Sequence, residues 1–94
     1  MFEWDPRKAQ ANADKHGVTF DEAVTMFFDA NALDGPDLLH SGAEARFRRL
    51  GRSDTGHVLT VVYTWRSTGH AETIRLISAR RASRREREAY TAQD

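Results

Sequence analysis

Six arginines stand close together near the end of the chain: Arg75, Arg80, Arg81, Arg84, Arg85 and Arg87. Arginine presents a planar fork of N–H donors that can bind one phosphate through two hydrogen bonds. We expect Arg75 inside a strand, Arg80 and Arg81 at its end, and Arg84 in the first turn of a helix, whose N-terminus also attracts anions. This arrangement predicts a phosphate-binding site. The alternative is a solvated basic helix whose arginines pair with nearby glutamates.

A second group that could carry chemistry is Glu44 with Arg46, at the start of an arginine-rich strand predicted over 45–53. A carboxylate beside arginines can serve as a general base, or only as their salt-bridge partner. His40 is the histidine nearest to this strand, and Tyr90 falls about two helical turns after Arg84, facing either the site or the core. No two histidines have the spacing of a zinc site, so a metal centre is not expected.

The elements that position these residues follow from caps, turns and hydrophobic period. Asp5-Pro6 and Gly17 bound a first helix, and Thr19 with Glu22 predicts a capping box for a second helix that ends near residues 28–29. Ser83 and Glu86 predict a further capping box. Strands are predicted at 32–34, 45–53, 58–65 and 72–79, turns at 53–56 and 66–69, and a last helix at 84–92.

Strands joined by such short connections form hairpins, so the sheet is expected to be antiparallel. The sequence therefore predicts one α+β domain over residues 1–94: two N-terminal helices, an antiparallel sheet of three to four strands, and a C-terminal helix. We expect the helices to share one face of the sheet. Simple alternation places Arg75 on the face opposite to Ile74 and Leu76.

Composition excludes several classes of protein. The chain has 94 residues, 39% of them hydrophobic, and no cysteine. Disulfide scaffolds, thiol catalysis and iron–sulfur clusters are thereby excluded, and no apolar run is long enough for a transmembrane helix. With no signal-peptide pattern at the start, a cytoplasmic protein is expected.

The net charge of zero hides two opposite halves. Residues 1–44 hold three basic and nine acidic residues, whereas residues 45–94 hold eleven arginines and five acidic residues. The basic half suggests an anionic partner, nucleic acid first. The alternative is a fold whose acidic half neutralises its basic half. For an enzyme, an arginine-rich site without metal or cysteine favours RNA cleavage, in which the substrate supplies its own 2′-hydroxyl as the nucleophile.

Several motifs together resemble the BrnT family of ribonuclease toxins from type II toxin–antitoxin systems. They are FEWD at 2–5, KHGV at 15–18, FDEA at 20–23, GRS at 51–53, VVYT at 61–64, IRLISARRA at 74–82, Glu86-Arg87 and Tyr90. The resemblance implies a RelE-like fold and a ribonuclease that needs no metal or cofactor. It implies catalytic roles for Arg75, Arg80, Arg81 and Glu44, and contacts to RNA from Arg46, Arg84, His40 and Tyr90.

The resemblance also implies a partner, a BrnA-type antitoxin with a ribbon-helix-helix DNA-binding portion. The antitoxin would neutralise the toxin, and DNA would be bound only by the complex of the two. Two other hypotheses stay open: an inactive relative that binds an antitoxin and regulates an operon, and a nucleic-acid-binding domain with no partner. Cleavage of RNA in the presence of a chelator would distinguish the ribonuclease toxin from these two alternatives.

Overall fold

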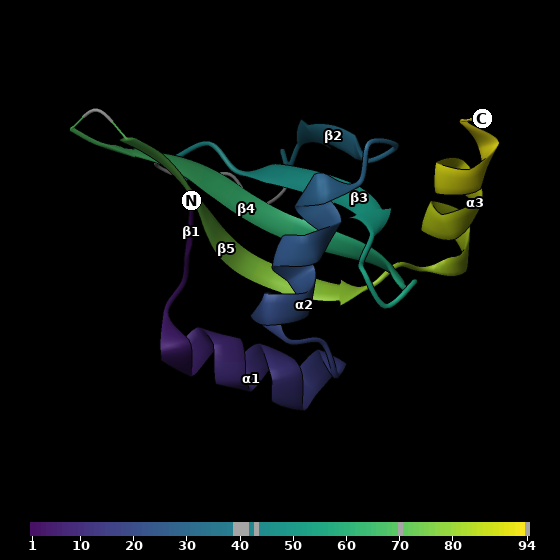
Figure 1. The fold of residues 1–94 in the computed structure, drawn as a ribbon, viewed down its shortest axis with the longest axis horizontal. Helices are drawn as coiled ribbons and strands as arrows, with labels where there is room; N and C mark the ends of the chain where they lie inside the picture. The colour runs from purple at the N-terminus through teal and green to yellow at the C-terminus, as the bar shows by residue number, and fades with distance from the viewer. Residues whose placement is uncertain (39–41, 43, 70, 94) are drawn as a thin grey trace.

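The computed structural model describes residues 1–38, 42, 44–69 and 71–93. Its elements are β1 (Phe2–Glu3), α1 (Pro6–His16), α2 (Phe20–Thr25), a 3₁₀ turn η1 (Met26–Phe28), β2 (Leu33–Pro36), β3 (Phe47–Arg52), β4 (Val58–Thr68), β5 (Ala71–Arg81) and α3 (Arg84–Ala92) (Figure 1). None of the helices in this described part is long and apolar enough to cross a membrane.

The first two helices begin where their capping residues predict. The Asp5 side chain accepts a hydrogen bond from the backbone N–H of Arg7 at 2.9 Å. Gly17 ends α1 with φ = +69°, a conformation that glycine adopts without strain. Thr19 caps α2 by accepting from the N–H of Glu22. In the predicted capping box, the Glu22 carboxylate would accept a hydrogen bond from the backbone N–H of the cap residue. It instead accepts hydrogen bonds from the turn between β3 and β4.

The sheet has five strands in the order β1-β5-β4-β3-β2. Strands β2 to β5 pair antiparallel, as predicted. The expectation of three to four strands, all antiparallel, is wrong at one edge, where β1 pairs parallel with β5 through Phe2–Ile74 and Glu3–Arg75. A strand of two residues is too short to show a hydrophobic period, so the sequence pattern could not reveal it.

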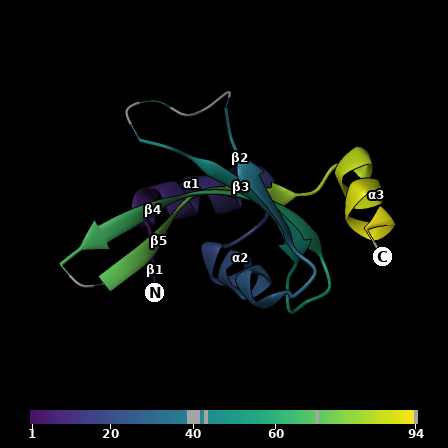
Figure 2. The ribbon, with the colours of Figure 1, turned by 90° about the horizontal axis from the view of Figure 1, so that it is seen from above.

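The three helices do not share one face of the sheet, which corrects the expected layout. Helices α1 and α2 pack on one face and enclose the core with β4 and β5, whereas α3 stands beyond the end of β5 (Figures 1 and 2). The buried core residues are Val18, Phe20, Ala23, Met26, Leu59, Val61, Tyr63, Leu76 and Ala79. Neither α1 nor α2 covers the opposite face of the sheet, which we call the open face.

A β-bulge in β5 changes which side chains reach the open face. Val62 pairs with Ser78 and Tyr63 pairs with Leu76, so Ile77 has no partner on β4. The extra residue inverts the alternation of side chains along the rest of the strand. Arg75 lies opposite Thr64 and Arg80 opposite Thr60, two β4 residues on the same face. Without the bulge, residues five apart on one strand would point to opposite faces.

Candidate functional site: arginines on the open face

Two arginines from different strands define the candidate site. Arg48 on β3 pairs with Val62 on β4, and Arg80 on β5 pairs with Thr60 on the same strand. Directly paired residues point to the same side of a sheet, so both arginines project from the open face. Their side chains are 40% and 39% exposed, which leaves both guanidinium groups accessible to a ligand.

Between these arginines lies the carboxylate of Glu86, from the first turn of α3. Arg80 donates two hydrogen bonds to it, Nη1 to Oε1 at 2.7 Å and Nη2 to Oε2 at 3.0 Å. Arg48 Nη1 is 4.0 Å from Oε2. The backbone N–H of Ser83 also donates to Oε1, which completes the predicted capping box. The open face therefore binds a planar anion in the two-pronged geometry that arginine also uses for phosphate.

The charges in this cluster depend strongly on one another. Burial alone raises the pKa of Glu86, but hydrogen bonds from Arg80 and Ser83, together with the charge of Arg80, lower it to about 2. The hydrogen bond to Glu86 in turn raises the pKa of Arg80. Glu86 and Arg80 are therefore both ionised at neutral pH, and Glu86 is a weak base there.

A second arginine pairing lies along the same face, nearer to β1. Arg75 Nη1 is 3.1 Å from Glu3 Oε2, and this ion pair links β5 to β1. The Asp37 carboxylate is almost fully buried and lies 3.7 Å from Arg48 Nη2, so it helps to position that guanidinium. The open face thus presents Arg48, Arg75 and Arg80 with three carboxylates in support.

Comparison with known proteins identifies the family. A family described as "Ribonuclease toxin, BrnT, of type II toxin-antitoxin system" matches residues 4–86. The chain belongs to the BrnT family. The crystal structure of the Brucella abortus ribonuclease toxin BrnT is similar to it, with 26% sequence identity and a TM-score of 0.64, over 89% of this chain and 99% of that chain. A search of curated proteins finds no match.

This BrnT-family chain is accordingly a ribonuclease toxin of a type II toxin–antitoxin system, as the sequence motifs indicated. The α+β class predicted from the sequence is also confirmed. The roles of individual residues are a separate question, because neither comparison assigns them. They have to be argued from where the structure of this BrnT-family chain places each predicted residue.

Arg81 does not join Arg80 on the open face. It pairs with Leu59, a core residue on the face that α1 and α2 cover. It also lines a pocket of about 280 Å³, together with Arg52, His57 and Arg87. Among the described residues, no carboxylate lines this pocket. The structure therefore places Arg75 and Arg80 on one side of the sheet and Arg81 on the other.

Two of the other predicted site residues, Glu44 and Arg84, lie apart from the open-face cluster. Glu44 is exposed in the bend before β3, and Arg46 follows it, with its carbonyl accepting from the N–H of Asp37. Arg84 is 87% exposed and pairs with Glu88 on the same helix. His40 lies outside the described residues. The carboxylate that meets the arginines is thus Glu86, not Glu44.

Tyr90 is buried between α3 and the chain that follows η1. Its hydroxyl donates a hydrogen bond to Asp29, and the guanidinium of Arg52 lies 5.5 Å from its ring centre. Burial and the hydrogen bond to Asp29 raise the pKa of Tyr90. These contacts hold α3 in place, which is the core-like alternative that the sequence left open.

Sequence reasoning missed Arg48 and Glu86 as members of the candidate site. Arg48 follows Arg46 by two residues on the same predicted strand, so alternation alone placed the two on one face. Glu86 was predicted only as a helix cap, and the cap geometry also aims its carboxylate at Arg80. No spacing rule links residues 48, 80 and 86, because their proximity comes from the sheet.

Proposed function

We propose that this toxin cleaves RNA without a metal ion, at the phosphate that Arg48 and Arg80 bind on the open face. The observation that carries the proposal is the two-pronged binding of a carboxylate by Arg80, with Arg48 beside it. A phosphodiester presents two anionic oxygens in a similar arrangement. Among the described residues, no group of three or more His, Asp or Glu side chains is placed to hold a metal ion.

The reaction that suits this site is internal attack by the RNA itself. The 2′ oxygen forms a bond to the adjacent phosphorus, and the bond from phosphorus to the 5′ oxygen of the next nucleotide breaks. The 2′ oxygen loses a proton and the 5′ oxygen gains one, so the products end in a 2′,3′-cyclic phosphate and a 5′-hydroxyl. Arg48 and Arg80 stabilise the negative charge that grows on the phosphate during attack.

RNA must compete with Glu86 for Arg80. The carboxylate accepts from both terminal nitrogens of Arg80, so a phosphate gains the same two-pronged contact only when Glu86 moves aside. Glu86 lies in the first turn of a nine-residue helix, and its exposed neighbours Arg84 and Glu88 pair with each other. The competition sets RNA affinity rather than preventing binding, because a phosphodiester is also an anion.

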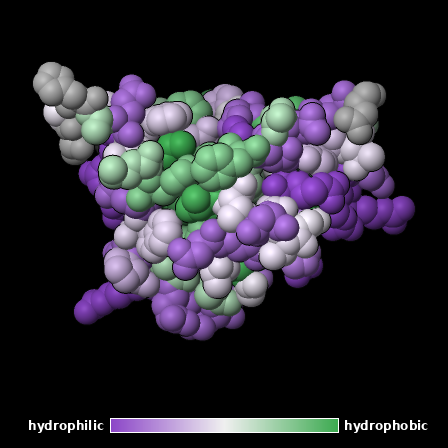
Figure 3. All heavy atoms as spheres, in the orientation of Figure 1, coloured by the Kyte–Doolittle hydropathy of each residue, from purple (hydrophilic) through white to green (hydrophobic). Residues whose placement is uncertain are grey.

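A protein partner is the second part of the proposal. Figure 3 shows an apolar band on the face that carries α2, bordered by hydrophilic side chains. Phe28, in η1 directly after α2, is 79% exposed, and its ring lies 6.5 Å from that of Phe2. Exposed apolar patches of this kind mark protein-binding surfaces. We infer that a BrnA-type antitoxin with a ribbon-helix-helix portion neutralises the toxin in the cytoplasm, and that DNA is bound only by their complex.

The decisive experiment incubates purified protein with a defined single-stranded RNA in excess EDTA. Wild-type protein is expected to cleave, leaving 2′,3′-cyclic phosphate ends that mass spectrometry identifies. A variant with Arg48→Ala and Arg80→Ala should lose cleavage while keeping a cooperative unfolding transition.

Two results would redirect the proposal. Full cleavage by the double variant would move the site away from the open face, with the Arg81 pocket as the next candidate. Absence of cleavage by folded wild-type protein, with or without translating ribosomes, together with tight antitoxin binding, would instead support the inactive operon-regulating module.

A further inference from the structure

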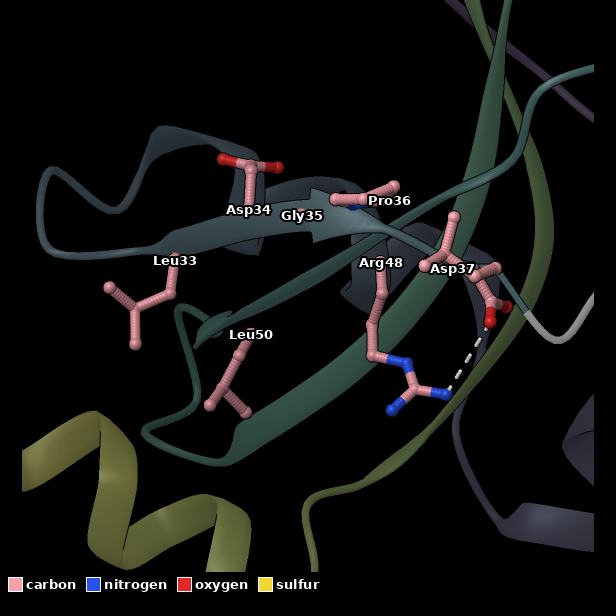
Figure 4. A pocket seen from close by; sticks show the side chains of 8 residues that line it. Leu33, Asp34, Gly35, Pro36, Asp37, Arg48 and Leu50 are labelled. Atoms are coloured by element: carbon pink, nitrogen blue, oxygen red, sulfur yellow. Dashed lines mark ion pairs between the residues drawn. The ribbon is translucent and has the colours of Figure 1, made fainter.

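A hollow lies next to the arginine cluster, at the edge of the sheet. It has a volume of about 360 Å³ and is lined by β2, the residues just after it and two residues of β3. Leu33 on β2 pairs with Leu50 on β3, and Gly35 pairs with Arg48. Figure 4 shows Leu33, Leu50 and Arg48 pointing to the same side of these strands, the open face. The hollow and the proposed phosphate site therefore share one surface.

The walls of this hollow are mainly apolar although they face solvent. Leu33 is 38% exposed and Leu38 is 80% exposed. Asp34 points away in Figure 4 and is paired with Arg49 and Tyr63 on the other face of the sheet. These exposed leucines, which lie beside the arginine cluster, would lose contact with water if a ligand covered them, and this would favour binding.

Arg48 connects the hollow to the cluster. Its side chain forms part of the hollow's wall, and the same guanidinium lies beside the carboxylate of Glu86. A ligand that binds Arg48 through a phosphate would thus carry its neighbouring atoms toward Leu33 and Leu50. In a nucleotide, one sugar separates the phosphate from the base, so the base is the group placed there.

We propose that the hollow binds one unstacked nucleobase of the RNA whose phosphate lies on Arg48 and Arg80. This inference rests on the proposed function and adds a base subsite to it. Proteins commonly recognise single-stranded RNA through splayed-out bases that pack against side chains. The volume is that of a small-molecule site. Because its walls offer apolar area, the subsite favours the larger purines over pyrimidines.

The test compares two ligands that differ only in the base. Adenosine 5′-monophosphate and ribose 5-phosphate are titrated into the full chain, and binding is followed by NMR chemical shifts. Wild-type protein should bind the nucleotide about fivefold or more tightly than the sugar phosphate. Leu33→Ser should bring this ratio close to one without weakening ribose 5-phosphate. Trp65→Ser, which removes a half-exposed apolar side chain outside the hollow, should leave the ratio unchanged.

The outcomes separate the base subsite from the phosphate site. If Arg48→Ala weakens both ligands equally and the wild-type ratio is already one, the base subsite is refuted and the phosphate site stands. If Arg48→Ala and Arg80→Ala change neither affinity, the phosphate site itself is wrong. If Leu33→Ser loosens antitoxin binding but keeps the nucleotide preference, the hollow is a protein-docking surface, and the proposal fails.

Discussion

Arg80 and Arg81 are adjacent in the sequence, yet they offer their charges to opposite sides of the sheet. Arg80 meets Glu86 and lies near Arg48, whereas Arg81 lines the pocket that contains Arg52 and Arg87. The β-bulge at Ile77 causes this difference, because it determines which of the two arginines lies on the open face with Arg75. A variant that removes both arginines cannot tell the two surfaces apart, so single variants are needed.

We predict that Arg80→Ala lowers the rate of RNA cleavage about 100-fold or more, the usual effect of removing a donor that stabilises transition-state charge. Arg81→Ala is its matched control, with the same change in charge and size one residue away. It should keep cleavage within about threefold of wild type under the same reasoning. Rates measured in single turnover with saturating protein provide the comparison. The reverse order of effects would assign cleavage to the Arg81 pocket.

Glu86 gives the second prediction at this scale. Glu86→Gln removes the negative charge that competes for Arg80 but keeps an oxygen that can accept the cap bond from Ser83. RNA should therefore bind several-fold more tightly to the variant, as measured by fluorescence anisotropy. The control is Glu88→Gln, which removes an exposed charge two residues along the same helix.

Unchanged RNA affinity in Glu86→Gln would show that phosphate does not enter the fork of Arg80. The cleavage rate of the same variant carries separate information. Because its pKa is about 2, Glu86 is a weak base at neutral pH, and the rate is expected not to fall. A strong loss of rate together with tighter binding would make Glu86 a proton acceptor instead.

Among the secondary-structure elements, helices were easier to predict than strand ends. Caps at Asp5, Thr19 and Ser83 are local signals, and all three helices begin directly after them. The long hairpin was underestimated, because Arg66 and Ser67 read as turn residues but continue β4 opposite Thr73 and Glu72. Cross-strand pairing outweighed local turn propensity there, and no residue type signals such an extension.

Asn12 shows how an element can be held by one buried side chain whose role no cap rule or hydrophobic period reveals. Its amide Nδ2 donates to the carbonyls of Val18 and Ala79, and its Oδ1 accepts from the N–H of Ala79. The side chain therefore satisfies the edge of β5 where β1 has ended and ties α1 to it. The site depends on this edge, because Ala79 directly precedes Arg80.

Asn12→Ala should lower the free energy of unfolding by about 2–3 kcal/mol, because it leaves buried backbone groups of β5 without partners. Chemical denaturation followed by circular dichroism measures the change. Gln10→Ala is the control: it removes an exposed amide from the same helix and should cost less than about 0.5 kcal/mol. Equal costs for the two variants would mean that water replaces the Asn12 bonds freely.

Glu22 joins α2 to the turn between β3 and β4 and gives a prediction about pH. Burial raises its pKa, but hydrogen bonds from Thr55, Ser53 and His57 outweigh this and lower it below 4.5. A carboxyl whose folded pKa is lowered stabilises the fold above its unfolded pKa, and this stabilisation is lost as the pH falls through the folded pKa.

Wild-type stability should therefore decline as the pH falls below about 4.5, as the Glu22 carboxylate takes up a proton. Glu22→Gln should be less stable at pH 7 and show a shallower decline over the same range, as measured by denaturation at a series of pH values. Asp21→Asn, on the exposed side of the same helix, should keep the wild-type profile. A parallel decline in Glu22→Gln would assign the acid sensitivity to other carboxylates.

Across the whole molecule, the charge pattern was readable in advance but its spatial meaning was not. The sequence showed an acidic half and a basic half, and the structure interleaves them. Acidic residues of the first half, Glu3, Asp34 and Asp37, lie beside arginines of the second. Both interpretations of the charge pattern are thus partly realised: carboxylates pair with these arginines, and Arg48 and Arg80, although paired, stay 40% and 39% exposed on the open face. Which arginines stay accessible depends on strand register, and the composition contains no information about register.

This arrangement predicts that RNA binding depends on a few local charges and not on net charge. For single strands, the logarithm of the binding constant falls with the logarithm of salt concentration by about 0.7 for each phosphate neutralised. Removing Arg48 and Arg80 by alanine should therefore reduce that slope by about 1.4 if each neutralises one phosphate. Lys8→Ala with Lys15→Ala changes net charge equally but on α1, across the sheet from the open face, and should leave the slope unchanged. Anisotropy titrations of a short RNA at several salt concentrations measure all three slopes. Equal reductions in the two double variants would mean that RNA responds to the overall field of the molecule, and the open face would lose its claim to be the binding surface.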